Sequence, residues 1–475
     1  MHKYLMLDRG ILVGYSLTNS KITVNKIQKD TENNPLFGEE FFGNPAKRWE
    51  VRYDNSYPNV IYDPKYKIYR CYYTLFTYDE SAENTSLKER ASTDYIPTGS
   101  RITSLCYAES KDGIEWTKPN LGLVDFEGNK ENNILFRYAH GTGVFLDEEE
   151  LDPKKRYKLV TKVEYSNARH YMAVAFSEDG IHFSELQEWN KYNPAADSHN
   201  FPFRDKKTGK FMLITRTWKN GLRVSSLCES TDFINWSEPK EILRGSGYEN
   251  QVYSMPIIQY AGIYLGLASM YHEGNTEADN YDTVDVELKY ASTPDVWDSV
   301  SDGQYVIERG LGTYPTGEFD SGCIYAAAPI EVDGKLRVYY MGGNGKHTNF
   351  RETSFALGYL EKDKFAGYEA VDNSRDAKLV TYHFSVYGDY LSILADIEPK
   401  GHLSVAIGNK NGKVYEGFED ENCIIEKQES GYYKVTFKGK KLTDLRTLPA
   451  SLHITFNKAK VYAIRGEFEC QKLKY

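Results

Sequence analysis

The amino-acid sequence predicts an all-β protein, a five-bladed β-propeller followed by a C-terminal β-sandwich. Two observations predict the propeller: a short turn motif recurs along the chain, and five stretches repeat the same order of strands. A change of pattern near residue 372 predicts the sandwich. The expected domains are an N-terminal lead-in at 1–47, the propeller at 48–371 and the sandwich at 372–475.

The recurring turn motif is Ser-x-Asp followed by an aromatic residue. It occurs as SKDGIEW from Ser110, SEDGIHF from Ser177, STDFINW from Ser230 and, more loosely, STPDVW from Ser292. Successive starts lie 67, 53 and 62 residues apart, which suits one four-stranded blade per repeat. We expect the Ser and Asp side chains to close the turn on backbone N–H groups and the aromatic residue to pack between neighbouring sheets.

Each repeat contains three strands in the same order before the motif. The first strands follow Asp54, His140, Asp197, Glu249 and Asp320. Each second strand follows a charged or glycine-containing turn, and each third strand leads toward the motif. Alternating side chains rich in Val, Ile and Tyr are typical of strands. Five first strands therefore predict five blades, each with local antiparallel pairing.

Three stretches lie outside the repeats. Residues 1–47 are expected to lead into the blades and to offer a strand to the last one. The insertion YDESAENTSLKERASTDYIPTG in blade one is too long for a hairpin loop, so we expect it to overhang the central funnel. Beyond about Asp372, strands such as HLSVAIG and YYKVTF alternate with Asn-Gly and Gly turns, which predicts the sandwich.

Composition limits the function classes. The formal net charge is −10 and no basic stripe is visible, so neither nucleic acid nor a membrane surface is an expected partner. The six Cys lack metal-binding spacing, and several lie in apolar strand patterns. Reduced core thiols suit a cytoplasmic location; a secreted location stays open if a signal peptide has been removed. The sequence leaves the oligomeric state open.

The residues just before the first strands are the candidate site. In a propeller these strands line the central axis, so their starting residues meet at one mouth of the channel. Four of the five starting residues are carboxylates, and clustered like charges are costly unless they are used. A single Asp before a strand is more often a turn residue, but four at equivalent positions favour function.

Paired carboxylates at one mouth predict cleavage of a glycosidic bond. Asp54 is the expected nucleophile or base, Asp197 the expected stabiliser of the transition state, and Glu249 the expected general acid, ahead of Glu318. We expect Arg204 to lower the pKa of Asp197. The expected substrate is an oligosaccharide, bound by Glu50, Asn55, His140, His199, Asn200, Arg204, Tyr253, Glu318 and Asp320. No cofactor or catalytic metal is expected, because His-x-His, HExxH and calcium-loop patterns are absent; a structural calcium ion in the funnel stays open.

Two segments carry a resemblance to known enzymes. RWEVRYDNSYPNVIYDP and DSHNFPFRDKKTGKFMLI resemble the strands of the nucleophile and of the stabilising Asp in five-bladed propeller glycosidases. The closer resemblance is to family 32, the β-fructosidases, which also end in a β-sandwich; family 43, the arabinofuranosidases and xylosidases, is more distant. The resemblance implies a retaining hydrolase that releases fructose- or arabinose-like furanosides from a chain end.

The chain also departs from the family 32 pattern. Blade two opens with HGTGVFLD, which has no carboxylate before the strand, and the Trp-Met-Asn-Asp-Pro-Asn and Glu-Cys-Pro signatures are absent. The substrate therefore does not carry over directly. A phosphorolytic glycosidase stays open, with Arg204, Arg216 and His347 as candidates for a phosphate pocket, and so does a propeller that binds carbohydrate without catalysis.

Overall fold

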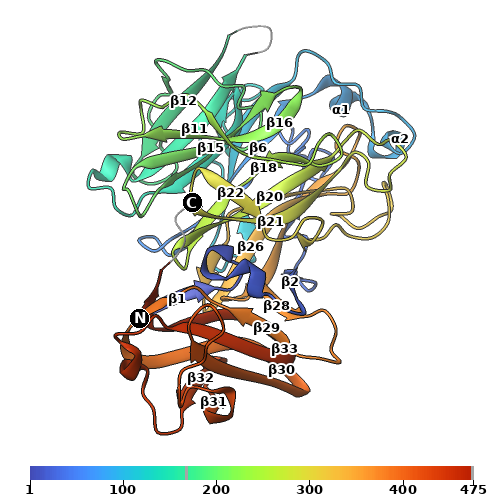
Figure 1. The fold of residues 1–475 in the computed structure, drawn as a ribbon. Coiled ribbons are helices and arrows are strands. Elements are labelled where there is room, and N and C mark those ends of the chain that lie inside the picture. The colour runs from blue at the N-terminus through green and yellow to red at the C-terminus, as the bar shows by residue number, and fades with distance from the viewer. Residues whose placement is uncertain (166–168, 472–475) are drawn as a thin grey trace.

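The computed structural model describes residues 1–165 and 169–471, and nearly all of its regular structure is β (Figure 1). This confirms the predicted all-β class. The α-helices α1 (Glu80–Asn84) and α2 (Leu87–Arg90) lie in the predicted insertion, and short 3-10 turns occur at Arg9–Ile11, Gly14–Ser16, Pro153–Lys155, Asp420–Asn422 and Leu442–Leu445. Within the described residues, no helix has the length and apolar character needed to cross a membrane.

Three separate antiparallel sheets, here called groups one to three, come first in the chain. Group one contains β5 (Asn59–Asp63), β6 (Ile68–Tyr78), β7 (Ile102–Ser110), β8 (Trp116–Thr117) and β9 (Ile134–Arg137). Group two contains β10 (Ala139–Leu146), β11 (Tyr157–Glu164), β12 (His170–Ser177) and β13 (Gln187–Glu188). Group three contains β14 (Phe201–Arg204), β15 (Phe211–Lys219), β16 (Leu222–Ser230) and β17 (Lys240–Arg244).

Groups four and five share one twelve-stranded sheet, joined by a parallel bridge between Val284 and Cys323. Their first strands are each split at a proline, Pro256 and Pro329, because proline has no N–H for the ladder. Group four contains β18 (Gln251–Ser254), β19 (Ile257–Tyr260), β20 (Ile263–His272), β21 (Thr283–Thr293), β22 (Val296–Ser299) and β23 (Tyr305–Ile307). Group five contains β24 (Cys323–Ala326), β25 (Ile330–Val332), β26 (Lys335–Gly343) and β27 (Thr353–Glu361).

The N-terminal segment joins two parts of the molecule. Its strands β3 (Gln28–Lys29) and β4 (Phe37–Gly38) pair with β27, so the lead-in does extend group five. Its strands β1 (His2–Leu5) and β2 (Ser20–Val24) belong instead to the C-terminal sheet, where they pair with β33 and β28. The segment therefore fastens the C-terminal sheet to the last group.

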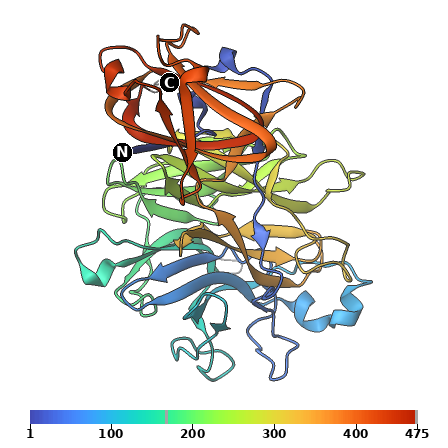
Figure 2. The same cartoon turned by 90° about the horizontal axis from the view of Figure 1, so that it is seen from below.

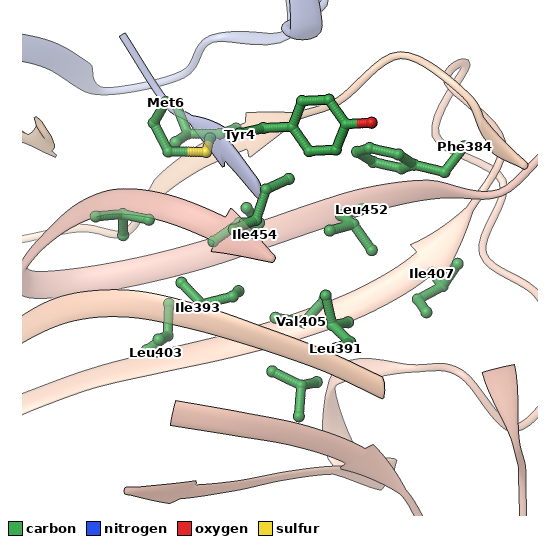
Figure 3. Packing of buried hydrophobic residues seen from close by; sticks show 14 of the residues in the cluster. Tyr4, Met6, Phe384, Leu391, Ile393, Leu403, Val405, Ile407, Leu452 and Ile454 are labelled. Carbon is green, nitrogen blue, oxygen red and sulfur yellow. The ribbon is translucent and has the colours of Figure 1, made fainter. Parts of the chain in front are cut away.

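The C-terminal strands form one eight-stranded sheet around an apolar core. Figures 1 and 2 place it, in orange and red, to one side of the other groups. Figure 3 shows Val405 and Ile454 among its buried side chains. The sandwich arrangement and the domain limits stay predictions. Its remaining strands are β28 (Ala366–Ala370), β29 (Ala377–Val380), β30 (Phe384–Gly408), β31 (Cys423–Lys427), β32 (Tyr432–Phe437) and β33 (Ser451–Cys470).

The recurring motif forms the predicted turn. In the first copy, Asp112 Oδ1 accepts hydrogen bonds from the backbone N–H groups of Ile114 and Glu115 at 2.8 and 2.9 Å, and Ser110 Oγ accepts one from Gly113 at 2.8 Å. The copies at Ser177 and Ser230 repeat this pattern. These turns are stabilised by hydrogen bonds within the motif itself, so the sequence alone predicts them.

The turns also connect neighbouring groups. The Tyr72 hydroxyl of group one donates to the Gly180 carbonyl in the turn of group two at 2.8 Å. The same contact recurs between the Tyr339 hydroxyl of group five and the Gly113 carbonyl of group one, also at 2.8 Å. The indole of Trp116, which follows that turn, packs edge-on against Phe355 of group five. The last group therefore contacts the first.

Glycines in β10 allow groups two and three to approach closely. The Asn200 backbone N–H donates to the Gly141 carbonyl at 2.8 Å. A Cβ on Gly143 would lie 1.7 Å from the Asn200 carbonyl oxygen, so no larger residue fits there. The two glycines of HGTGVF are therefore packing residues that bring His140 beside the start of group three.

Candidate active site

Strained backbone marks the starts of the first three groups. Asp54, Ser56 and Tyr57 have φ values of 54°, 56° and 46°, and Tyr138 and Ala196 have φ values of 65° and 45°. Positive φ is uncommon for residues other than glycine and costly for a bulky residue such as tyrosine. Strain of this kind concentrates at functional sites, where the surrounding structure holds it in place.

Asp54 lies against two arginine side chains. Arg351 Nη2 donates to Asp54 Oδ1 at 2.7 Å, and Arg52 contacts the same oxygen through Nε at 3.3 Å and Nη2 at 3.2 Å. Burial acts to raise the pKa of Asp54, but the charges of Arg351 and Arg52 outweigh it and hold that pKa well below its ordinary value. Asp54 is therefore ionised at neutral pH, as a nucleophile or base requires.

Asp197 is half-exposed and is held by a different arginine from the one expected. Arg216 Nη2 donates to Asp197 Oδ2 at 2.5 Å. Arg204 instead binds Asp147 through two hydrogen bonds of 2.9 and 2.6 Å. The expected pair fails because Asp197 precedes β14 whereas Arg204 ends it, and a strand of that length separates its two ends.

His140 lies between two carboxylates. Its Nε2 atom is 3.3 Å from Asp197 Oδ1, and its Nδ1 atom is 3.4 Å from Glu164 Oε2. Lys162 Nζ contacts the other oxygen of Glu164 at 2.7 Å. Burial acts to raise the pKa of Glu164, but His140 and Lys162 together lower it to about 2.

A chain of polar and aromatic contacts joins the two aspartates. Arg351 Nη2, which holds the first, also donates to Asn55 Oδ1 at 2.7 Å. Asn55 Nδ2 in turn donates to the Tyr57 hydroxyl at 2.9 Å and the Tyr253 hydroxyl at 3.4 Å. The Arg216 guanidinium, which holds the second aspartate, stacks 4.6 Å from the centre of the Tyr253 ring. Residues from groups one, three, four and five thus meet in one network.

His347 and Tyr325 complete this network. The Tyr325 hydroxyl lies 3.0 Å from His347 Nδ1, and the rings of Tyr325 and His347 both pack against Tyr253. Burial, aided by the charge of Arg351, lowers the pKa of His347 to about 3, so its imidazole is neutral at physiological pH.

A pocket of about 570 Å³ opens beside Asp197. The end of the predicted insertion contributes Thr98 and Gly99 to its wall, so the insertion does border the site. Trp218 adds an aromatic wall. The charged and imidazole side chains along the pocket are Arg101, His140, Lys162, Glu164, His170 and Asp197. Its size and polar lining suit a small polar ligand.

Two predicted substrate-binding residues lie beneath the network. His199 is buried, its Nε2 atom is 2.9 Å from Asn59 Oδ1, and burial lowers its pKa to about 3. Asn200 is also buried, and its side-chain amide donates to the Gly141 carbonyl at 2.9 Å. Both residues hold the site together without lining the pocket.

Four other predicted residues do not line the pocket. Glu50 and Asp320 are buried, and their carboxylates contact lysines, Lys118 at 2.8 Å and Lys29 at 2.7 Å. Burial raises the pKa of Glu50. Glu318 is exposed and accepts a hydrogen bond from the Leu311 N–H at 2.8 Å. Glu249 is exposed on the turn before β18.

Sequence reasoning missed Glu164, near the end of its second strand, and named Arg216 only as a candidate for a phosphate pocket. In an antiparallel hairpin the second strand returns to the start of the first, as the pairing of His140 with Lys162 shows. Glu164 and Arg216 lie on second strands at positions beside the start of the first strand. A polar residue at such a position could therefore have been predicted to lie near the site. Arg351 comes from the loop between β26 and β27, and no local pattern indicated that it would reach Asp54.

Comparison with known proteins yields structural likenesses only. No family profile matches the chain, and no curated protein matches it. Among solved structures, a candidate glycosidase from Bacteroides thetaiotaomicron is similar at 16% identity and a TM-score of 0.45, covering 70% of this chain and 96% of its own.

Two further structures show likenesses of the same order. One, from work on mannoside phosphorylases and hydrolases of the GH130 family, has 12% identity and a TM-score of 0.45, and covers 72% of this chain and 95% of its own. An N-acetylgalactosamine deacetylase from F. plautii has 13% identity and a TM-score of 0.43, and covers 74% and 96%. TM-scores below 0.5 establish neither a shared site nor a shared substrate.

Proposed function

We propose that this chain is an enzyme that cleaves a glycosidic bond in an oligosaccharide. The observation that carries the proposal is the single network that joins Asp54 to Asp197, of which Asp197 lines a polar pocket. Glycoside cleavage needs one ionised carboxylate to attack or to activate water and a second carboxyl group as general acid, through a transition state with positive charge on the sugar ring. Asp54 supplies the ionised carboxylate, and Asp197 supplies negative charge that can stabilise the ring.

The proposed general acid is Glu249. Cleavage needs an acid that protonates the leaving oxygen. Asp54, Asp197 and Glu164 each contact an arginine or lysine, whereas Glu249 forms no ion pair within the described residues. Its position on the turn before β18 places it at the start of the fourth group.

We also propose that the five groups are the blades of a propeller and that the C-terminal sheet folds as a sandwich. The contacts that support closure are those between Tyr339 and Gly113 and between Trp116 and Phe355, which connect group five to group one. In a closed ring, the strands at the edge of each blade lie against the neighbouring blades.

The finer chemistry follows the resemblance to the β-fructosidases. We propose exo cleavage of a fructose- or arabinose-like furanoside with retention of configuration. The segments that begin the first strands of groups one and three, and the ionised state of Asp54, support this assignment. Retention requires the attacking carboxylate and the acid to lie about 5–5.5 Å apart with substrate bound.

Phosphorolysis is a second candidate, favoured by the positive charge around Asp54. Arg52 and Arg351 contact that carboxylate, and within the described residues Arg52 Nη1 and Arg351 Nε are buried without a hydrogen-bond partner. Of the expected phosphate-binding residues, Arg216 and His347 lie in the network, whereas Arg204 binds Asp147 outside it.

A panel of nitrophenyl glycosides, with sucrose and levan, tests the proposal. We expect cleavage of at least one furanoside, and a sharp loss of rate for Asp54→Asn. Asp112→Asn makes the same chemical change in a surface turn and should keep the wild-type rate. Assays with and without phosphate, followed by product analysis, separate a free sugar from a sugar phosphate. An Asp54→Asn variant as active as the wild type would refute the mechanism.

A further inference from the structure

Three side chains with metal-binding atoms meet at the wall of the pocket. His140 is the second residue of β10, Glu164 ends β11, and Asp197 lies in the loop before β14. One ligand atom from each lies within 4.8 Å of the others. Because the three come from separate segments, no short sequence motif announces them, and the sequence predicted no metal here.

The two carboxylates are oriented by cations on their outer oxygens. Lys162 binds Oε1 of Glu164 at 2.7 Å, and Oε2 faces His140. Arg216 binds Oδ2 of Asp197, and Oδ1 faces His140. Each carboxylate therefore has one oxygen beside a ring nitrogen of His140, Nδ1 for Glu164 and Nε2 for Asp197, and has its other oxygen bound by a cation. Ligands in metal sites are commonly oriented by such outer contacts.

The imidazole of His140 contacts the two carboxylates at 3.4 and 3.3 Å without the geometry of a hydrogen bond. Both of its ring nitrogens are buried, and within the described residues neither has a hydrogen-bond partner. A buried polar atom without a partner is costly, so such an atom in a native site calls for an additional group. A cation bound by the imidazole and the two carboxylate oxygens would be the partner that the imidazole nitrogen lacks.

We propose that His140, Glu164 and Asp197 bind one divalent transition-metal ion, of the class of Zn²⁺ or Mn²⁺. One imidazole nitrogen and two carboxylate oxygens are ligands that such ions accept, and three protein ligands leave coordination positions open. The open positions face the pocket, where hydroxyl oxygens of a bound sugar can fill them. Cation binding does not depend on which bond the enzyme cleaves.

Metal titration of the whole chain tests this site without any substrate. Tag-free protein is treated with EDTA, dialysed and titrated with Zn²⁺ or Mn²⁺ in a calorimeter, and Co²⁺ is added separately to record visible absorption. We expect one ion per chain and a Co²⁺ spectrum typical of nitrogen and oxygen ligands. His140→Gln and Glu164→Gln should each weaken binding at least about tenfold.

His182→Gln is the matched control. His182 Nδ1 lies 2.7 Å from Asp179 Oδ2 on the surface. This pair shares a histidine and a carboxylate with the proposed metal site, but it does not include a second carboxylate. Its replacement should leave the affinity unchanged. Circular dichroism and the unfolding midpoint show whether each variant is folded, and Asp197→Asn replaces any variant that is not.

Two results would overturn the proposal. One is the absence of stoichiometric binding in the wild type, which would mean that His140 contacts the two carboxylates without a shared ion. The other is unchanged affinity in the folded His140→Gln and Glu164→Gln variants. A protein that binds the ion but cleaves no glycoside would refute the proposed function and leave the metal site standing.

Discussion

Asp197 and Asp320 occupy the same position in two repeats but have opposite surroundings. Each precedes the first strand of its group, and each contacts a cation, Arg216 for one and Lys29 for the other. The side chain of Asp197 is 48% exposed beside a pocket, whereas that of Asp320 is 1% exposed. The Tyr340 hydroxyl donates a second bond to Asp320 at 2.9 Å.

The difference comes from the N-terminal segment. Its strands β3 and β4 pair with β27, and Lys29 on β3 covers the carboxylate of group five. Within the described residues no N-terminal strand pairs with group three, and its aspartate is half-exposed beside the pocket. An acidic residue at the start of a first strand is therefore either a site residue or a structural anchor, depending on what the rest of the chain places over it.

The largest expected effect is on turnover. Asp197→Asn should lower kcat/KM by about 10²- to 10⁴-fold, the range found when a group that acts on the transition state is lost. Asp320→Asn, assayed where it is folded, should stay within about threefold of the wild type, since its carboxylate faces Lys29. Equal losses in the two variants would contradict the division of roles between groups three and five.

The second-largest expected effect is on stability, and here the Asp320 variant is expected to lose more than the Asp197 variant. Asp320→Ala should lower the free energy of unfolding by about 3 kcal/mol, because it leaves Lys29 and the Tyr340 hydroxyl without their buried partner. Asp298→Ala breaks an exposed pair with Arg9 and should cost less than about 1 kcal/mol. Urea unfolding measures both. A small loss for Asp320→Ala would show that the N-terminal cover is loose.

A third effect is pH-dependent and concerns Glu39, also on the N-terminal segment. Burial raises its pKa to about 7, against an ordinary value of 4.5. The folded state thus holds this proton more tightly than the unfolded state, so stability falls as pH rises from about 4.5 to 7. Glu39→Gln, compared with the wild type, should gain about 1–3 kcal/mol more at pH 8 than at pH 5.

Urea unfolding at pH 5 and at pH 8 measures this difference. The Gln side chain keeps an acceptor for the Tyr53 and Thr353 N–H groups that Glu39 Oε1 now binds. A stability difference between Glu39→Gln and the wild type that is the same at both pH values would mean that Glu39 titrates normally.

The smallest expected effect concerns the pocket wall. Trp218 is 46% exposed and lines the pocket that Asp197 borders. Trp218→Ala should raise KM for an oligosaccharide about two- to tenfold, the value of one aromatic contact, with little change in kcat. Tyr15→Ala is the control, because it removes an exposed aromatic side chain that is distant in sequence from Trp218. A change confined to kcat would show that Trp218 does not bind substrate.

Local chemistry explains what the sequence predicted well. The Ser-x-Asp turns depend on side chains two or three residues away, so Asp112 and its counterparts were readable directly. The strand order followed from alternation. Asp54 and Asp197 were placed at strand starts by the same reading, and the structure joins them through one network.

Long-range contacts explain what the sequence did not predict. Arg351 reaches Asp54 from the last group, and Lys29 covers Asp320 from the N-terminal segment. Neither contact leaves a local pattern. Glu164 was a partial exception, because a polar residue at the end of a second strand returns to the first strand start of the same hairpin.

A crystal structure of the chain soaked with fructose or arabinose tests the central claim most directly. The account predicts the sugar in the pocket beside Asp197, with its anomeric carbon facing the Asp54 carboxylate. A sugar bound elsewhere, with Asp54 and Asp197 both left to water and to their arginines, would contradict it.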